Sequence, residues 1–455
     1  MFKYESDSRK IKPGQTFVAL KGLTVDGHDF IGKAIENGAS KIICEHEIDY
    51  DIPKEIVPNT LEWLKSTLYN EYHEYIDKLN LIGVTGTNGK TTSCYLTYQM
   101  LNSLGVNTAY IGTIGYHHKD EFIELNNTTP DVLTIYSLLY HAYESGCSCV
   151  VMEVSSQALS YDRLFGIKYN IISFTNLTED HLDYHKTMEN YLNAKLLILD
   201  HLKENAIITA NSDDEKHTKF KKENHKFITF GFNGDYKIIN TLINPVETNL
   251  TFNFNNKEYN VTIPLTSKFN VYNYLTMLSI VNNYGISIED IINKTNLLAA
   301  PKGRCESYKV KNGFAIIDYA HTPDAVEKVI TAYNELKKNR VITIIGCGGD
   351  RDPKKRPIMG DIATKLSDYV IFTNDNPRTE DQTNIMNDIL KGVKTNNYEV
   401  IFDRKEAIKK GIDMMKVNDI LLILGKGHEN YQIIGKEKHH LDDSEEVLKW
   451  KKNLD

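Results

Sequence analysis

A glycine-rich turn between an apolar strand and a helix constrains the fold of this chain more than any other stretch. Near residue 78 the sequence reads LNLIGVTGTNGKTTSCYLTYQMLNSLG, an apolar strand followed by a glycine turn and an amphipathic helix. A nucleotide-binding βα unit begins in this order. The simpler interpretation is a glycine turn that only caps a helix. We favour a phosphate loop, because the strand, the Gly-Lys-Thr sequence and the helix stand in the required order.

The residue types in this turn suit phosphate and magnesium. Gly86 and Gly89 allow backbone N–H groups to approach a phosphate. Lys90 offers a positive charge, and the hydroxyl of Thr91 suits Mg²⁺. Val84 stands where the general phosphate-loop pattern has glycine, so the spacing departs from that pattern. The predicted nucleotide loop contains Gly86, Thr87, Asn88, Gly89, Lys90, Thr91 and Thr92.

The strand patterns predict three α/β domains. Residues 1–77 combine short strands with one helical stretch, which indicates a small first domain. Residues 78–303 contain further apolar strands separated by helices, which predicts a mostly parallel sheet covered on both faces. Within them, residues 236–264 alternate like antiparallel hairpins. Residues 304–455 repeat the α/β pattern, and each strand there ends in a polar or glycine-rich loop, where ligands of such sheets collect.

Composition excludes several other classes of protein. The chain has 455 residues, so about two or three domains are expected. A formal net charge of −8 disfavours a nucleic-acid partner. The first residues lack the apolar core of a signal peptide, and no run of about 18 apolar residues occurs. We therefore expect a cytoplasmic protein without a membrane span, with its six scattered cysteines as inert thiols.

Three side chains after the phosphate loop are candidates for metal chemistry. Glu153 ends the apolar strand VVMEVSS, and a carboxylate there is a suitable ligand for Mg²⁺. His181 follows the strand IISFTN, and its spacing to His185 resembles a zinc pair. We disfavour zinc, because no nearby cysteine or glutamate completes such a site. Lys195 lies in YLNAKLLIL, where residue patterns alone favour a lysine that snorkels to solvent.

Further motifs accompany the glycine turn in a fixed order along nearly the whole chain: DSR, PGQTFVALKG, NTTP, MEVSSQAL, FTNLTEDHLDYH, YLNAK, FNVYN, DYAHTPD, GCGGDRD, DNPR and GKGHE. This ordered set resembles the Mur ligases, the amide-forming enzymes of peptidoglycan precursor synthesis. The resemblance implies a small N-terminal UDP-binding domain, a central P-loop ATPase-like domain and a C-terminal Rossmann-like domain. It also implies a monomer that uses ATP and Mg²⁺.

The resemblance implies a reaction without an enzyme nucleophile. The γ-phosphoryl group of ATP passes to a substrate carboxylate, and an amine attacks the acyl phosphate to give an amide. The implied catalytic residues are Lys90, Glu153, His181 and Lys195. The implied metal ligands are Thr91, Glu153, His181 and Lys195, the last as a carbamate that supports a second Mg²⁺. Further ATP contacts are implied at Asn270, Arg304 and His321.

The carboxylate substrate implied by the resemblance is UDP-MurNAc-L-Ala-D-Glu, held across the first two domains. Its contacts are Ser8, Leu23, Thr24, Val25, Asn127, Thr128, Thr129, Ser155, Tyr161 and Arg163. Tyr161 and Gln157 depart from the residues that are common in the family. The first domain also begins later than is usual, so its uracil-side wall is expected to differ.

The incoming amino acid is expected in the third domain, at Arg351, Asp375, Asn376, Pro377, Arg378, Gly425 and Glu429. Two arginines and a carboxylate suit a zwitterion with an extra carboxylate, because arginine binds carboxylates bidentately. In the family, DNPR accompanies meso-diaminopimelate. The simpler interpretation of these residues is a solvated salt-bridge loop.

Four alternative functions remain open from the sequence. They are a paralogue that serves a secondary pathway, a member that adds L-lysine or another amino acid, a folylpolyglutamate or cyanophycin type of ligase, and a P-loop protein that hydrolyses ATP as a switch.

Overall fold

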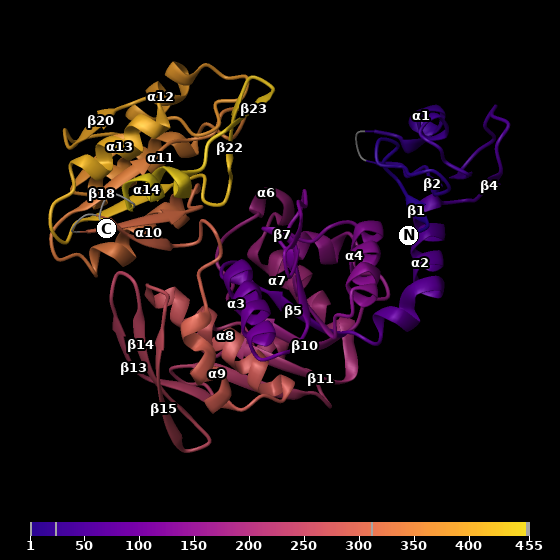
Figure 1. The fold of residues 1–455 in the computed structure, drawn as a ribbon, viewed down its shortest axis with the longest axis horizontal. Helices are drawn as coiled ribbons and strands as arrows, with labels where there is room; N and C mark the ends of the chain where they lie inside the picture. The colour runs from indigo at the N-terminus through magenta and orange to yellow at the C-terminus, as the bar shows by residue number, and fades with distance from the viewer. Residues whose placement is uncertain (1, 23–24, 311–312, 452–455) are drawn as a thin grey trace. The chain divides into compact units, whose positions relative to one another are not determined.

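The computed structural model describes residues 2–22, 25–310 and 313–451 (Figure 1). They form two compact units. One contains Met1–Phe230 with Thr276–Ile286, and the other contains Gly231–Leu275 with Ser287–Asp455. The division falls inside helix α8 (Lys268–Tyr284). The predicted domain boundaries at residues 77/78 and 303/304 stay predictions.

The first unit begins with a small parallel sheet in the order β1-β2-β3-β4. Its strands are β1 (Tyr4–Glu5), β2 (Thr16–Val18), β3 (Lys41–Cys44) and β4 (Lys54–Ile56). Helices α1 (Ile31–Glu36) and α2 (Thr60–Ile76) accompany it. The side chain of Asn59 caps α2 by accepting a hydrogen bond from the Glu62 N–H. The first α/β domain therefore has the expected elements.

The part of the larger sheet that falls in this unit has the strand order β12-β11-β10-β5-β9-β6-β7-β8. The strands are β5 (Asn80–Thr85), β6 (Thr108–Gly112), β7 (Gly115–His118), β8 (Glu121–Ile123), β9 (Cys149–Glu153), β10 (Tyr169–Phe174), β11 (Leu202–Asn211) and β12 (Lys226–Gly231). Pairing is parallel from β12 to β6 and antiparallel from β6 to β8. A mostly parallel central sheet is thus confirmed.

Strand β5 lies between β9 and β10, and the sheet continues to β6 on the β9 side and to β11 on the β10 side. The carboxyl ends of β5, β9 and β10 meet at one edge, which is where ligands bind in open α/β sheets. The connecting helices are α3 (Lys90–Ser103), α4 (Val132–Glu144), α5 (Ser156–Ser160), α6 (Leu182–His185) and α7 (Met188–Leu196). Every residue of β6 and β9 is buried, as a strand covered on both faces requires.

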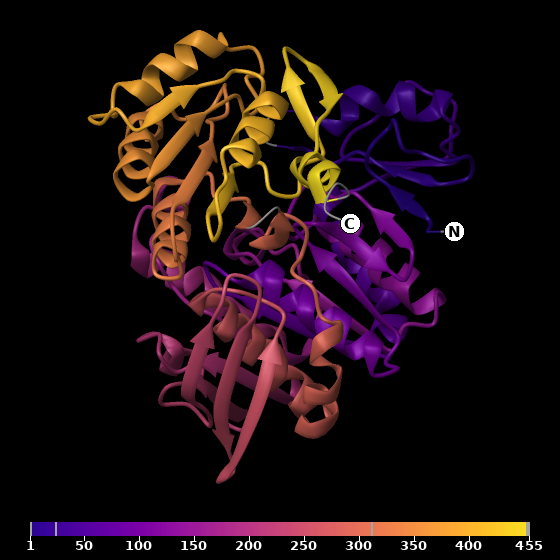
Figure 2. The same cartoon turned by 60° about the vertical axis from the view of Figure 1, so that its left-hand side comes forward.

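The second unit contains the predicted antiparallel strands β13 (Tyr236–Ile243), β14 (Thr248–Phe254) and β15 (Lys257–Ile263). Figure 2 shows these three strands in rose, running side by side. The short helix α9 (Ile288–Lys294) follows α8.

The rest of the second unit is a six-stranded sheet in the order β16-β17-β21-β18-β19-β20, parallel except for β16. Its strands are β16 (Glu306–Val310), β17 (Gly313–Asp318), β18 (Val341–Ile345), β19 (Tyr369–Phe372), β20 (Tyr398–Val400) and β21 (Ile420–Leu424). Its helices are α10 (Pro323–Asn334), α11 (Lys355–Leu366), α12 (Gln382–Leu390), α13 (Arg404–Asp413) and α14 (Asp443–Lys451). A hairpin of β22 (Tyr431–Ile434) and β23 (Glu437–His440) follows β21.

Alternate residues of β21 enter two different cores. Leu422 packs in a cluster with residues of α10, α11 and α12, whereas Leu421 and Ile423 pack with residues of α13 and α14. This sheet is therefore covered on both faces, as the Rossmann-like architecture implied for the third domain requires. No helix in the described part of the chain combines the length and apolar character needed to cross a membrane. All six cysteines are buried and carry free thiols.

Candidate active site

The glycine turn joins β5 to α3 and is shaped by the end of β10. Gly86 has φ of +147°, and a Cβ on it would lie 1.9 Å from the Oγ1 of Thr175, so only glycine fits. The backbone N–H of Thr87 donates to the carbonyl oxygen of Asn176 at 2.8 Å. The backbone N–H of Asn88 donates to the side-chain oxygen of Asn176 at 2.9 Å. These two hydrogen bonds hold the loop at the start of α3, and a helix N-terminus attracts anions.

Lys90 lies inside this loop. Its Nζ donates to the carbonyl oxygens of Gly86 and Thr87, at 2.9 and 2.8 Å. The geometry suits a positive charge that moves from carbonyl oxygens to phosphate oxygens when a nucleotide binds.

Glu153 faces the phosphate loop, as expected from its place at the end of β9. Its carboxylate accepts hydrogen bonds from Thr91 Oγ1 at 2.9 Å and from the Tyr110 hydroxyl at 2.5 Å. The backbone N–H and hydroxyl of Thr113 donate to it at 2.8 and 3.2 Å. The adjoining oxygens of Thr91 and Glu153 are the hard ligands that Mg²⁺ prefers, so this pair fits the ion. The described residues contain no cluster of three histidine, cysteine or acidic side chains with metal-site geometry.

Lys195 is 1% exposed, so the snorkelling interpretation is wrong. Its Nζ donates to the carbonyl oxygen of Gly86 at 2.7 Å and lies 4.3 Å from the centre of the Tyr191 ring. Burial, with the nearby charge of Lys90, lowers the pKa of the Lys195 amine well below its usual value. A buried amine with a lowered pKa is the form of lysine that reacts with CO₂, because only the neutral amine is nucleophilic.

The two histidines of HLDYH have different environments. His181 precedes α6 with φ of +53°, is exposed, and has its Nε2 3.7 Å from a carboxylate oxygen of Asp180. His185 is buried, and its Nε2 is 2.9 Å from the hydroxyl of Ser156. Burial lowers the pKa of His185. His181 lies outside the helix that holds His185, which gives no support to a zinc pair.

Four of the predicted substrate residues surround the backbone beyond Glu153. The hydroxyl of Thr129 donates to the Glu153 carbonyl oxygen at 2.8 Å and accepts the backbone N–H of Ser155 at 3.0 Å. Arg163 donates from Nη1 to the Thr129 carbonyl oxygen at 2.8 Å. The hydroxyl of Thr128 lies 3.0 Å from that of Thr113. The structure therefore brings Thr128, Thr129, Ser155 and Arg163 together near Glu153.

Of the other predicted substrate residues, Tyr161 contacts a member of this cluster, and the rest that the structure describes form no side-chain hydrogen bond with it. Tyr161 is 45% exposed, and the guanidinium of Arg163 lies 5.6 Å from the centre of its ring. Asn127 and Val25 are exposed, and Ser8 is buried beside the small sheet. Leu23 and Thr24 lie outside the described residues.

The predicted ATP contacts of the second unit have three different environments. Asn270 is buried at the start of α8 and donates to the Thr266 carbonyl oxygen at 2.8 Å. The guanidinium of Arg304 lies 4.9 Å from the centre of the Tyr319 ring, and its buried Nε has no partner among the described residues. His321 is exposed, with Nδ1 2.7 Å from the Tyr319 carbonyl oxygen.

The predicted amino-acid residues gather at the carboxyl ends of β18, β19 and β21. The Asn376 Nδ2 donates to Glu429 Oε2 at 2.7 Å, and the Asn376 Oδ1 accepts the Ile433 N–H at 2.9 Å. Asp375 and Pro377 are buried on either side of Asn376. Gly425 has φ of +111°, and a Cβ there would lie 2.7 Å from a carboxylate oxygen of Asp375.

Arg351 and Arg378 border the same glycine. A Cβ on Gly348 would lie 2.9 Å from the Nη1 of Arg378 and 3.9 Å from the Cγ of Arg351. Arg351 donates to the Asp350 carbonyl oxygen at 3.1 Å, and Arg378 donates to the Gly349 carbonyl oxygen at 2.8 Å. Neither guanidinium forms an ion pair with a described carboxylate, so the salt-bridge interpretation is not supported for these two residues.

Sequence reasoning missed Lys426, which is completely buried beside this group. Its Nζ donates to Asn376 Oδ1 at 3.2 Å and to Glu429 Oε2 at 3.3 Å, and it also donates to the carbonyl oxygen of Tyr431. A lysine between two glycines after the apolar strand ILLILG was the available signal. The buried Lys426 ammonium donates to three acceptors, and these hydrogen bonds orient the side chains of Asn376 and Glu429.

Three family descriptions match the chain in order. "Mur ligase family, catalytic domain" matches residues 4–76, "Mur ligase middle domain" matches residues 84–281, and "Mur ligase, glutamate ligase domain" matches residues 303–427. Together with the sheet order and the phosphate loop, these matches define the class of protein. The chain belongs to the Mur ligase family.

Two curated relatives are similar over almost the whole chain. The "UDP-N-acetylmuramoyl-L-alanyl-D-glutamate--2,6-diaminopimelate ligase" of Bacillus cereus is 43% identical, over 97% of this chain and 92% of its own. The corresponding ligase 1 of Clostridium acetobutylicum is 42% identical, over 98% of this chain and 94% of its own.

Solved structures agree with the fold. A structure titled with the same diaminopimelate ligase name has a TM-score of 0.69 at 31% identity, covering 100% of this chain and 95% of its own. A MurF ligase of Thermotoga maritima in complex with ADP has a TM-score of 0.70 at 20% identity, covering 99% of this chain and 97% of its own. The three-domain Mur ligase fold predicted from the motifs is confirmed.

Proposed function

We propose that this chain is an ATP-dependent ligase of the cytoplasm that joins meso-diaminopimelate to the D-glutamate carboxylate of UDP-MurNAc-L-Ala-D-Glu. The observation that carries the proposal is the pair of guanidiniums on Arg351 and Arg378. The Nη1 of Arg378 and the Cγ of Arg351 border Gly348, and neither guanidinium has a carboxylate partner among the described residues. A substrate carboxylate is the partner that such a pair suits. The printed names of the two bacterial relatives support the same substrate pair.

The phosphate loop prepares the first step. The Lys90 ammonium and the N–H groups at the start of α3 hold the phosphates of ATP, so that the γ-phosphoryl group faces the substrate carboxylate. Thr91 and Glu153 would hold Mg²⁺, which would supply positive charge to neutralise the phosphates. The carboxylate oxygen forms a bond to the γ-phosphorus as the bond to ADP breaks, and positioning supplies most of the rate.

Lys195 enters the proposal through its buried amine. The neutral nitrogen attacks the carbon of CO₂, forms an N–C bond and loses a proton, which leaves a carbamate anion. That anion places a negative charge beside the phosphate loop, where it would be a ligand for a second Mg²⁺. His181, exposed before α6, is the second protein group that we assign to this ion.

The second step takes place at the residues that hold the amino acid. The carboxylate of Glu429 accepts the substrate ammonium while Asn376 and Lys426 fix its orientation. Arg351 and Arg378 pair with the distal carboxylate of diaminopimelate. One ammonium of diaminopimelate loses a proton to water, and the resulting neutral amine attacks the acyl phosphate. The nitrogen gives up a second proton to water as the amide forms and the C–O bond to phosphate breaks.

The test is ADP and phosphate release with UDP-MurNAc-L-Ala-D-Glu and a panel of amino acids. We expect release only when both the dipeptide substrate and an amino acid are present, with meso-diaminopimelate strongly preferred. Release without an amino acid would identify a switch ATPase. Release with glutamate and a folate would identify a polyglutamate ligase, and equal use of L-lysine would overturn the diaminopimelate assignment alone.

A further inference from the structure

Two loops carry the proposed arginine pair, and they are tied together along their length. Residues 346–352 follow β18 and contain Arg351, and residues 373–380 follow β19 and contain Arg378. The N–H of Gly349 donates to the Asn376 carbonyl oxygen at 2.9 Å, and Arg378 returns a hydrogen bond to the Gly349 carbonyl oxygen at 2.8 Å. A Cβ on Gly349 would lie 1.9 Å from the Pro377 carbonyl oxygen, so the two backbones touch.

Backbone strain shows that these contacts are needed. Asp350 has φ of +52° and Arg378 has φ of +53°, in the left-handed region that residues other than glycine rarely adopt. Such conformations persist only where the surroundings determine them. Thr379 supplies part of that restraint, since its hydroxyl donates to both carboxylate oxygens of Asp350, at 3.0 and 2.9 Å, and its N–H donates at 3.1 Å.

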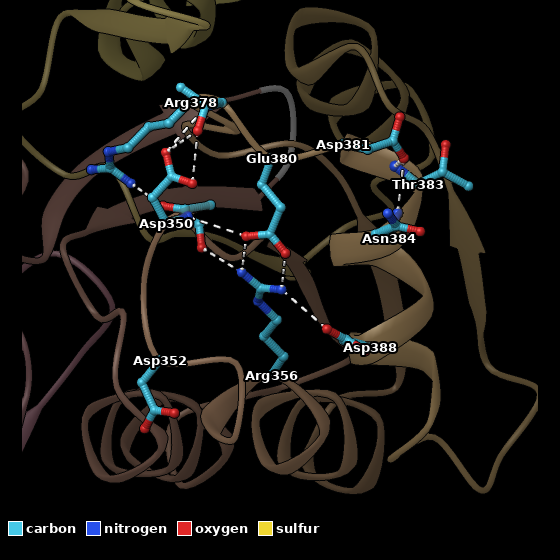
Figure 3. Close-up of polar contacts among 12 residues, drawn as sticks. Asp350, Asp352, Arg356, Arg378, Glu380, Asp381, Thr383, Asn384 and Asp388 are labelled. Atoms are coloured by element: carbon cyan, nitrogen blue, oxygen red, sulfur yellow. Dashed lines mark hydrogen bonds and ion pairs between the residues drawn. The ribbon is translucent and has the colours of Figure 1, made fainter.

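A buried arginine, paired with a partly exposed carboxylate, underlies the junction of the two loops (Figure 3). Arg356 is 1% exposed, and its Nη1 and Nη2 donate to the two carboxylate oxygens of Glu380, both at 2.6 Å. The same carboxylate accepts the backbone N–H of Asp350 at 3.1 Å, and Arg356 also donates to the Gly348 carbonyl oxygen at 3.3 Å. Glu380 therefore holds the residue directly before Arg351 while its own backbone follows Arg378 closely.

We propose that Glu380, fixed by Arg356, is a positioning residue that holds the Arg351 loop against the Arg378 loop. Its role is to keep both guanidiniums at the spacing of one substrate carboxylate. This inference rests on the proposed function, because it assigns to the two arginines the distal carboxylate of the amino acid. Without Glu380 the loops separate, and each arginine becomes a single exposed charge that no longer distinguishes diaminopimelate from lysine.

The chain offers a matched control in Asp388. Its carboxylate accepts from the same Arg356 Nη1 at 3.0 Å, and it also pairs with Lys391. Unlike Glu380, Asp388 has no hydrogen bond to either arginine loop among the described residues. Asp388→Asn therefore removes a negative charge that pairs with Arg356 but does not release the loops. Glu380→Gln removes such a charge and also releases the loops.

The experiment measures KM for each substrate in Glu380→Gln, Thr379→Val and Asp388→Asn enzymes whose folding is confirmed by thermal unfolding. In Glu380→Gln we expect the KM for meso-diaminopimelate to rise about tenfold to a hundredfold. In Thr379→Val, an exposed site with little effect on folding, we expect a rise of about three- to tenfold. Both variants should have a smaller preference for meso-diaminopimelate over L-lysine than the wild type. In Asp388→Asn, the KM for meso-diaminopimelate should stay within about twofold of the wild type. In all three variants, the KM for ATP and the KM for the dipeptide substrate should also stay within about twofold.

Two results would overturn the inference alone. One is an equal effect of Glu380→Gln and Asp388→Asn on the KM for diaminopimelate. The other, which decides the matter even if Glu380→Gln does not fold, is an unchanged diaminopimelate preference in Thr379→Val. A wild-type enzyme without any preference for diaminopimelate would overturn the proposed function, and this inference with it.

Discussion

The Nζ of Lys195 donates a hydrogen bond to the carbonyl oxygen of Gly86 at 2.7 Å, although the two residues are 109 positions apart in the chain. A fully buried amine thus touches the first glycine of the phosphate loop. The same carbonyl oxygen accepts from Lys90 at 2.9 Å, so two lysine nitrogens converge on it. Two neighbouring positive charges at a buried site favour the neutral form of the more buried amine, which is Lys195.

The first prediction concerns the activity of Lys195. Lys195→Ala should be nearly inactive, because it removes the proposed carbamate, and added formate or acetate should partly restore turnover. The measurement is ADP release, together with intact-protein mass in buffer that contains bicarbonate. An active wild-type enzyme whose Lys195 never carries the mass of CO₂ would contradict the carbamate.

The second prediction concerns the pH dependence of stability. Between its lowered folded-state pKa and the usual lysine value of about 10.4, Lys195 binds a proton in the unfolded chain but not in the folded chain. The free energy of unfolding should therefore rise with pH in that window, by up to about 1.4 kcal/mol per pH unit more than in Lys195→Met. Denaturant unfolding from pH 6 to 9 in CO₂-free buffer measures this slope. Equal slopes in the two proteins would mean that Lys195 is charged when folded.

The third prediction concerns Lys90. Lys90→Ala should abolish ligation and leave the fold intact, because the side chain lies inside the loop and contributes charge to phosphate binding. Turnover and thermal unfolding are measured on the same preparation. Near-normal turnover in this variant would rule out the ATP-loop assignment.

The fourth prediction concerns the choice of amino acid. Arg378→Ala should raise the KM for diaminopimelate steeply and narrow its advantage over lysine, while the KM for ATP changes little. Removing one partner of a buried charged pair costs roughly 2–5 kcal/mol, which is about 30-fold to several thousand-fold in binding. Exposed Lys338, which precedes β18 and so lies at the opposite end of that strand from the Arg351 loop, provides an alanine control. An Arg378→Ala enzyme that keeps the full preference for diaminopimelate over lysine would show that Arg378 of DNPR does not bind the distal carboxylate.

The fifth prediction concerns Lys426. Lys426→Met should raise the KM for the amino acid by about tenfold to a hundredfold, because Glu429 and Asn376 lose the ammonium that orients them. Lys438 is the matched control, since its exposed Nζ lies 4.2 Å from the centre of the Tyr431 ring beside the same group. If Lys438→Met and Lys426→Met have the same effect, the buried ammonium has no special role.

Some site residues were predictable from local sequence because their geometry is local. Gly86 and Gly89 need φ values of +147° and +86°, which glycine adopts at no steric cost, so their place in the turn follows from residue type. The position of Glu153 at the end of an apolar strand also predicted its approach to the phosphate loop. Lys195 was not predictable in this way, because whether a lysine on a helix is buried depends on what packs over it.

The sequence by itself determined the strands, the phosphate loop and the family, because apolar periodicity, glycine positions and ordered motifs are properties of short segments. The tertiary structure alone decided which charges are buried and which are paired. It placed Lys426 between Asn376 and Glu429, and it joined Arg356 to Glu380 beneath the two arginine loops. These contacts link segments that are distant in the sequence, and burial and pairing are determined by such contacts rather than by residue type.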